Sequence, residues 1–159
     1  MQFREIKRSK QALSEEECTA ILKQEKRGVL SVIGDGGWPY GVPMNHFYNA
    51  EDGCLYFHSG RGGHKLDALQ ACDKACYTVI GPESPGREAW SLYVRSVIVF
   101  GRVQRIEDHE QIARICRALS YKFTDDETYI AEELRRSGPA TALFRLVPEH
   151  MSGKLVHEA

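Results

Sequence analysis

A short run at positions 62 to 65, Gly-Gly-His-Lys, has the composition of an anion-binding site. Strand-forming residues precede it at positions 55–57, and from position 66 apolar residues recur along one face of a helix. Gly62 and Gly63 are therefore expected just before a helix N-terminus. There, unpaired backbone N–H groups and the helix dipole favour a negative charge, phosphate above all. His64 and Lys65 would add side-chain donors at the same place.

A second interpretation of this run stays open. It is not a Walker loop, because that motif needs Ser or Thr directly after the lysine and here Leu66 follows Lys65. A solvated turn with a surface lysine accounts for the same residues. The run alone therefore favours neither phosphate binding nor a plain turn.

Other kinds of chemistry have little support. The five cysteines are odd in number and scattered and form no C-x-x-C pair, which indicates reduced thiols. Cys54, His58 and His64 match no familiar metal-ligand spacing, so we expect no metal site. No G-x-S-x-G nucleophile motif occurs.

Length and charge set the class of the protein. A chain of 159 residues with 42% hydrophobic content can bury one core, so we expect a single domain over residues 1–159. The formal net charge of −1 gives no electrostatic footprint for nucleic acid. No apolar run is long enough for a membrane span, and the first residues lack a signal-peptide core. A cytoplasmic location without nucleic-acid or membrane partners follows as the expectation.

The N-terminal third predicts a helix and then a β-hairpin. Ser14 and Glu17 form a capping box, and the helix that they start should end between residues 26 and 28. Residues 29–33 and 38–48 are two strand patterns joined by an Asp-Gly-Gly turn.

Two prolines mark the second strand of this hairpin. Pro39 and Pro43 lack N–H groups, so the strand should lie at a sheet edge or be interrupted. A broken ladder would leave backbone groups of Met44 and Asn45 free to bond a ligand. An edge strand without a ligand is equally consistent with these residues.

The rest of the chain alternates between strand and helix patterns. Strands are expected at 55–57, 75–80, 90–105 and 142–147. Helices are expected from 64, from 108, where Asp108 and Gln111 form a cap, and over 129–136. The longest strand changes its alternation at Arg95-Ser96, which predicts either a β-bulge there or a strand that passes between two buried environments. The last residues, 148–159, either complete a site or form a frayed end. About six strands with a few helices predict an α+β, mainly β fold, a closed or split β-barrel.

Three segments in this order resemble the FMN-binding split-barrel family of pyridoxamine 5′-phosphate oxidases. They read VLSVIGDGGWPYGVPMNHFY, LYFHSGRGGHKLDAL and VRSVIVFGRV. GVPMNHFY, YFH…GHK and EHMSGK are most similar to the nitroimidazole-resistance (Nim) branch. The resemblance extends from about residue 11 to residue 156. It implies a split barrel, FMN as cofactor, and a homodimer whose flavin sites lie between the subunits.

The family's functional positions can be carried over residue by residue. The oxidases' phosphate-binding S-R-K run falls on His64-Lys65, so the resemblance implies Lys65 as phosphate ligand, with Arg61 as a substitute for the replaced arginine. Their ring-contacting glutamine falls on Ser96. The implied cofactor-binding set is Val42, Pro43, Met44, Asn45, Phe57, His58, Arg61, Gly63, His64, Lys65 and Ser96. Residues 148–159 contain no match to the Arg and His that hold the vitamin phosphate, which argues against pyridoxamine phosphate oxidation.

Together these features predict an FMN-dependent oxidoreductase of the Nim type, which takes electrons from a reduced donor and reduces a small, electron-poor substrate such as a nitroaromatic. His58 is the candidate catalytic residue, because an imidazole near the ring could donate a proton or stabilise charge. A hydrogen-bonded structural histidine is the alternative. The competing function is a flavin- or haem-binding carrier, store or sensor without turnover. Six histidines permit haem ligation, although no C-x-x-C-H motif occurs.

Overall fold

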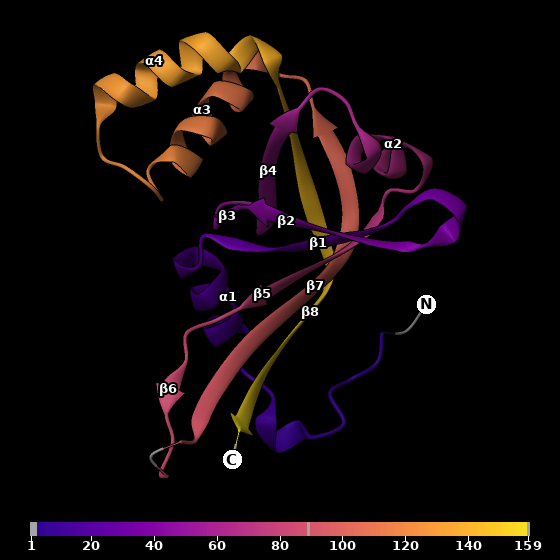
Figure 1. Ribbon diagram of the computed structural model, residues 1–159, viewed down its shortest axis with the longest axis vertical. Coiled ribbons are helices and arrows are strands. Elements are labelled where there is room, and N and C mark those ends of the chain that lie inside the picture. The colour runs from indigo at the N-terminus through magenta and orange to yellow at the C-terminus, as the bar shows by residue number, and fades with distance from the viewer. Residues whose placement is uncertain (1–2, 89, 159) are drawn as a thin grey trace.

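The computed structural model describes residues 3–88 and 90–158, which form one antiparallel sheet with four α-helices around it (Figure 1). The strands are β1 (Arg27–Ile33), β2 (Pro39–Asn45), β3 (Phe47–Asn49), β4 (Cys54–Gly60), β5 (Lys74–Ile80), β6 (Ser84–Pro85), β7 (Leu92–Ile106) and β8 (Thr141–Glu158). The α-helices are α1 (Glu15–Gln24), α2 (His64–Ala71), α3 (His109–Ser120) and α4 (Glu127–Ser137). Three short 3-10 turns are η1 (Ser9–Gln11), η2 (Asp35–Gly37) and η3 (Gly138–Ala140).

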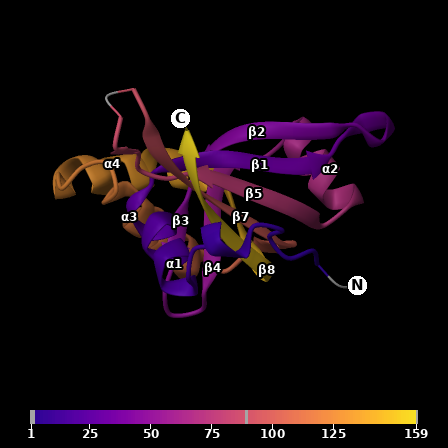
Figure 2. The same ribbon diagram turned by 90° about the horizontal axis from the view of Figure 1, so that it is seen from below.

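The sheet curls into half a barrel with the strand order β2-β1-β5-β7-β8-β4-β3, and β6 pairs with β7. Figure 2 shows β2, β1, β5 and β7 one after another when the molecule is seen from below. The helices α3 and α4 stand together over one end of β4, β7 and β8 (Figure 1). This arrangement confirms the expected α+β, mainly β split barrel.

Two hydrophobic clusters lie on opposite faces of β4. The concave face of the half-barrel holds the larger cluster, to which α1 contributes Cys18, Ile21 and Leu22. The smaller cluster includes Tyr56 of β4 and packs beneath α3. Neighbouring residues of β4 therefore face different clusters, as the alternation of side chains along a strand requires.

The hairpin of β1 and β2 has the edge position that the prolines predicted, but it is not interrupted. β2 lies at the end of the strand order, and its ladder with β1 runs from Arg27 opposite Asn45 to Ile33 opposite Pro39. Pro39 and Pro43 are four residues apart and so share one orientation in the ladder. Their missing N–H groups can therefore point to the free edge. The ladder is thus not broken at the prolines, whereas the strand expected over residues 38–48 divides at His46 into β2 and β3.

The longest strand pair corrects two further predictions. β7 pairs with β8 without a shift across Arg95 and Ser96, and the register changes between Phe100 and Gly101 instead. Phe100 faces His150 and Gly101 faces Pro148, so β8 has one additional residue there. Pairing continues to the end of β8, so the C-terminal residues up to 158 form a strand and not a frayed end. The change in alternation at Arg95-Ser96 does not come from a bulge. Alternation reflects burial, and β7 has buried residues only from Val97 onward.

Most helix predictions agree with the structure. The capping box of Ser14 and Glu17 is present, although α1 ends at Gln24, earlier than expected, because β1 begins at Arg27. The helix after the glycine run begins at His64 as predicted. None of the helices in the described ranges has the length and apolar character that crossing a membrane requires.

Candidate functional site

The glycine-rich run at positions 62–65 lies at the start of α2. β4 ends at Gly60, and Gly63 is the N-cap of α2 with φ at 110°, a conformation that strains residues other than glycine. Among the described residues no side chain caps this helix start. A Cβ added at Gly60, Gly62 or Gly63 would meet no atom within 4 Å. The start of α2 is therefore open, and a group as large as a phosphate has room there.

Lys65 lies half-buried in the first turn of α2. Its Nζ is 3.4 Å from Sδ of Met44 and 6.0 Å from the centre of the Phe144 ring. Burial lowers the pKa of Lys65. No carboxylate in the described part of the chain forms an ion pair with it. A cation in this state fits an anionic ligand, because a phosphate would supply the missing counter-charge.

His64 connects α2 to the β1–β2 hairpin. Its ring stacks on Tyr40 of β2 with the ring centres 4.2 Å apart. Its Nε2 accepts a hydrogen bond from the backbone N–H of Asp35 at 3.3 Å. Because Nε2 accepts, the proton of the neutral imidazole is on Nδ1, which is the one donor that His64 can offer to a ligand.

Residues 42 to 45 alternate between the two faces of β2. Val42 and Met44 pack with the core inside the half-barrel, whereas Pro43 is exposed on the outer face. Asn45 shares that outer face, and its Oδ1 accepts a hydrogen bond from Nε of Arg27 at 3.0 Å. Of these four, Met44 is the residue in contact with Lys65.

Two other expected cofactor residues lie apart from this group. The ring of Phe57 is fully buried and packs on two aromatic neighbours with ring centres 4.8 and 5.5 Å away. Ser96 pairs with Ile80 of β5 and Lys154 of β8, three strands from β2 in the sheet. Phe57 therefore offers only its backbone to a ligand.

His58 follows Phe57 but lies on the opposite face of β4, towards α3 and α4. It lines a cavity of about 90 Å³ together with residues of both helices. Although part of the side chain is exposed, burial lowers the pKa of His58, and the positive charge of Lys65 lowers it further. The imidazole is therefore neutral at pH 7. No group of three or more His, Cys, Asp or Glu within the described residues could hold a metal ion.

His46, a buried histidine that the sequence interpretation missed, lies next to the end of β2 and links it to α1 and β5. His46 has no exposed surface, and its Nε2–H donates to the carbonyl of Leu22 at 2.8 Å. The hydroxyl of Tyr77 lies 2.9 Å from Nδ1 of His46 and 2.9 Å from the carbonyl oxygen of Met44. Burial, and then the charge of Lys122, lowers the pKa of His46 to about 4. In the sequence, the one indication of this role was that His46 lies within a strand pattern. Such a pattern does not distinguish a buried histidine from an exposed one.

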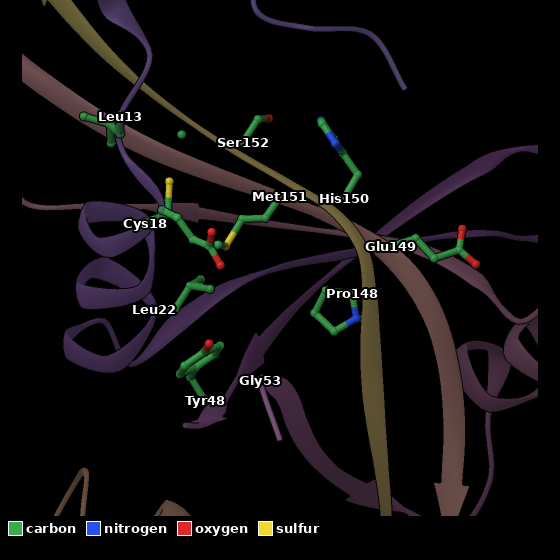
Figure 3. A pocket seen from close by; sticks show the side chains of 12 residues that line it. Leu13, Cys18, Leu22, Tyr48, Gly53, Pro148, Glu149, His150, Met151 and Ser152 are labelled. Carbon is green, nitrogen blue, oxygen red and sulfur yellow. The ribbon is translucent and has the colours of Figure 1, made fainter. Parts of the chain in front are cut away.

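A separate cavity of about 470 Å³ lies between α1 and the bend of β8 (Figure 3). Cys18, Leu22, Met151, Glu149 and His150 are among the residues that line it, and Figure 3 shows the carboxylate of Glu149 pointing away from Cys18 and Met151. Glu149 instead pairs with an arginine of β7 at 2.7 Å. None of the expected cofactor residues lines this cavity. The EHMSGK segment thus belongs to a different region from the start of α2.

The curled sheet with α2 beside its edge hairpin defines a split β-barrel protein. Residues 14–155 match the protein family described as pyridoxamine 5′-phosphate oxidase. The chain belongs to this family, and the expected family membership is confirmed.

Solved structures with the same fold include three with related cofactors or proposed roles. A protein of Bacteroides thetaiotaomicron, provisionally assigned as a 5-nitroimidazole antibiotic resistance protein, is 23% identical, with 92% of this chain and 87% of that one covered and a TM-score of 0.75. The flavocytochrome Anf3 of Azotobacter vinelandii is 23% identical over 95% and 72%, with a TM-score of 0.73. The FAD and haem binding protein of Mycobacterium smegmatis is 24% identical over 92% and 73%, with a TM-score of 0.72. No match was found among curated proteins.

Proposed function

We propose that the protein binds FMN and uses it to reduce a small, flat, electron-poor substrate of the nitroaromatic type, with electrons from a reduced donor. The observation that carries the proposal is the open start of α2 with the ammonium of Lys65, which forms no ion pair among the described residues, in a member of the pyridoxamine 5′-phosphate oxidase family. The likeness to the Bacteroides protein supports the substrate class. When bound, the flavin supplies the redox chemistry, and the protein supplies binding and orientation.

Several side chains are assigned to the phosphate of FMN. Lys65 donates from its ammonium, His64 from Nδ1–H, and Gly63 leaves room for the backbone N–H groups of the first turn of α2. Arg61 follows β4 in the same loop, is exposed and is the second cationic candidate.

The flavin ring is assigned to the outer face of the sheet. Pro43, Asn45 and Ser96 face outward there, whereas Val42 and Met44 would contribute backbone groups. His58 remains the candidate catalytic residue, because its neutral imidazole lines a cavity next to the loop that leads into α2.

The outer sheet face also supports a homodimer. Val29, Ile33, Ile80 and Phe100 are 39%, 47%, 67% and 38% exposed, and all four lie on that face by strand alternation. Such an apolar patch is typical of a protein interface. We therefore propose that two subunits meet there and share the flavin sites.

The five free cysteines are consistent with a cytoplasmic protein.

The visible spectrum of the purified protein tests the cofactor. Flavins in general absorb at about 375 and 450 nm. Bands at these positions support the proposal, provided that the extracted cofactor is FMN. Turnover is then measured with reduced nicotinamide and a nitroaromatic. Flavin that binds but is never reduced would refute the enzymatic part.

A carrier, store or sensor without turnover is the second candidate. It is favoured by the likeness to a flavocytochrome and to a protein that binds both FAD and haem. A Soret band in place of flavin bands would replace the first proposal with this one.

A further inference from the structure

A cavity of about 430 Å³ lies between α3, α4 and the ends of β4 and β8. Its apolar wall is formed by Ile112, Ala113, Cys116 and Leu134. It adjoins the smaller cavity in which His58 lies, since both are lined by residues 116, 134, 138 and 141. In Figure 1 the two helices project from the end of the sheet, on the side of the molecule where the loop between β4 and α2 passes. We call this cavity the helix cleft.

The charged side chains that line the helix cleft have one sign. Arg61 and Arg135 contribute guanidinium groups, and none of the described Asp and Glu residues lines this cavity. At 430 Å³, the helix cleft has the size of a small-molecule site, which is roughly 300 to 1,000 Å³. An apolar wall with cationic groups at its edge is complementary to an aromatic anion.

The other arginines of α3 and α4 provide a contrast. Each of the three has a carboxylate partner: Arg114 pairs with Glu51, Arg117 with Glu127, and Arg136 with Glu133. Among the described residues, neither Arg135 nor Arg61 has such an ion pair. Positive charge on these helices is therefore neutralised within the protein except beside the helix cleft.

We propose that the helix cleft binds a small aromatic carboxylate. Its ring lies against Ile112, Ala113 and Leu134, and its carboxylate pairs with the guanidinium groups of Arg135 and Arg61, which present two parallel N–H donors to such an anion. The site consists of residues outside the assigned FMN contacts, apart from Arg61. It goes beyond the proposed function because ligand binding there requires no flavin.

Calorimetric titration with two matched probes tests this site. 2-Naphthoate carries the negative charge, and 2-naphthamide has the same shape without it. The wild-type protein should bind naphthoate at least about tenfold more tightly, as a charge-assisted hydrogen bond predicts. Arg135→Gln should abolish most of this preference. Arg136→Gln, one residue further along α4, removes an arginine that is already paired with Glu133 and should leave the preference unchanged.

A cavity-filling variant tests the position of the ring. Ala113 is exposed at the wall of the helix cleft, so Ala113→Phe should fold normally and weaken both probes by about tenfold or more. Equal affinity for naphthoate and naphthamide in the wild type would overturn the proposal, as would unchanged binding in Ala113→Phe. FMN affinity, measured on the same variants, should stay at the wild-type value. A failure of flavin binding is thus recorded separately from a failure of the helix cleft.

Discussion

The substitution Lys65→Met tests whether the half-buried ammonium binds the FMN phosphate. Methionine keeps an apolar side chain between Met44 and the Phe144 ring but removes the positive charge, whose burial lowers the pKa of Lys65. A charge-assisted hydrogen bond contributes roughly 1.5 to 3 kcal/mol. Because about 1.4 kcal/mol corresponds to a factor of ten in affinity, the Kd for FMN should rise by about ten- to a hundredfold.

Riboflavin, which has the ring but no phosphate, provides the comparison ligand. Its Kd should be the same for the wild-type protein and Lys65→Met. Flavin fluorescence titrations of both ligands against both proteins form a cycle that isolates the coupling between the lysine and the phosphate. Lys23→Met is the control variant, because Lys23 is an exposed lysine of α1. It should change neither affinity.

Two further results complete this experiment. Without FMN, Lys65→Met should melt at the same or a higher temperature, since the cost of desolvating an unpaired ammonium is removed. Equal losses of FMN and riboflavin affinity would mean that Lys65 supports the fold or the ring site. No loss of either would make Lys65 an ordinary surface lysine and leave His64 and Arg61 as side-chain candidates. Either outcome refutes the assignment.

Three other predictions concern catalysis, assembly and pH. His58→Ala should lower turnover per bound flavin more than it lowers the melting temperature, and a less stable variant with intact turnover would make His58 structural. Light scattering of the wild-type protein should give about twice the chain mass of 18.0 kDa, and Ile80→Glu on the outer sheet face should give monomers. A wild-type monomer that binds FMN would contradict the shared site. Burial lowers the pKa of His46 from the ordinary histidine value of 6.5 to about 4 in the folded protein, so the unfolded chain takes up a proton first as the pH falls. The free energy of unfolding should therefore drop by about 3 kcal/mol between these pH values, and urea titrations of His46→Gln should show little of this drop.

Local signals predicted the elements of this fold well. Ser14 with Glu17, and Asp108 before α3, are side-chain caps that depend on residues only three positions apart, and both are present. The glycines before α2 and the prolines of β2 act on their own backbone, so their structural effects could also be predicted from the sequence. The prolines predicted an edge position or an interruption for β2, and the structure has the edge position.

Features that depend on pairing between distant strands were not predicted. Phe100 pairs with His150 and Gly101 with Pro148, so β8 has one residue more than β7 between these two pairs, and this residue forms the bulge. The hydrophobic pattern of β7 contains no information about β8. The faces of β4 illustrate the same limit, because a strand buried on both faces gives a continuous apolar run and does not show that Phe57 faces the larger cluster and His58 the side of α3 and α4.

Two contacts between residues far apart in the chain determine the geometry of the proposed phosphate site, and both act on β2. As an edge strand, β2 is hydrogen-bonded along one side only, so side chains must fix its position on the other. The stack of His64 on Tyr40 holds α2 against β2, and the hydroxyl of Tyr77 donates a hydrogen bond to the carbonyl of Met44, whose sulfur contacts Lys65. The proposed phosphate site therefore depends on residues that are not assigned to the phosphate. The family resemblance indicates Lys65 as the candidate phosphate ligand, but only the folded chain shows the tyrosines that position its surroundings.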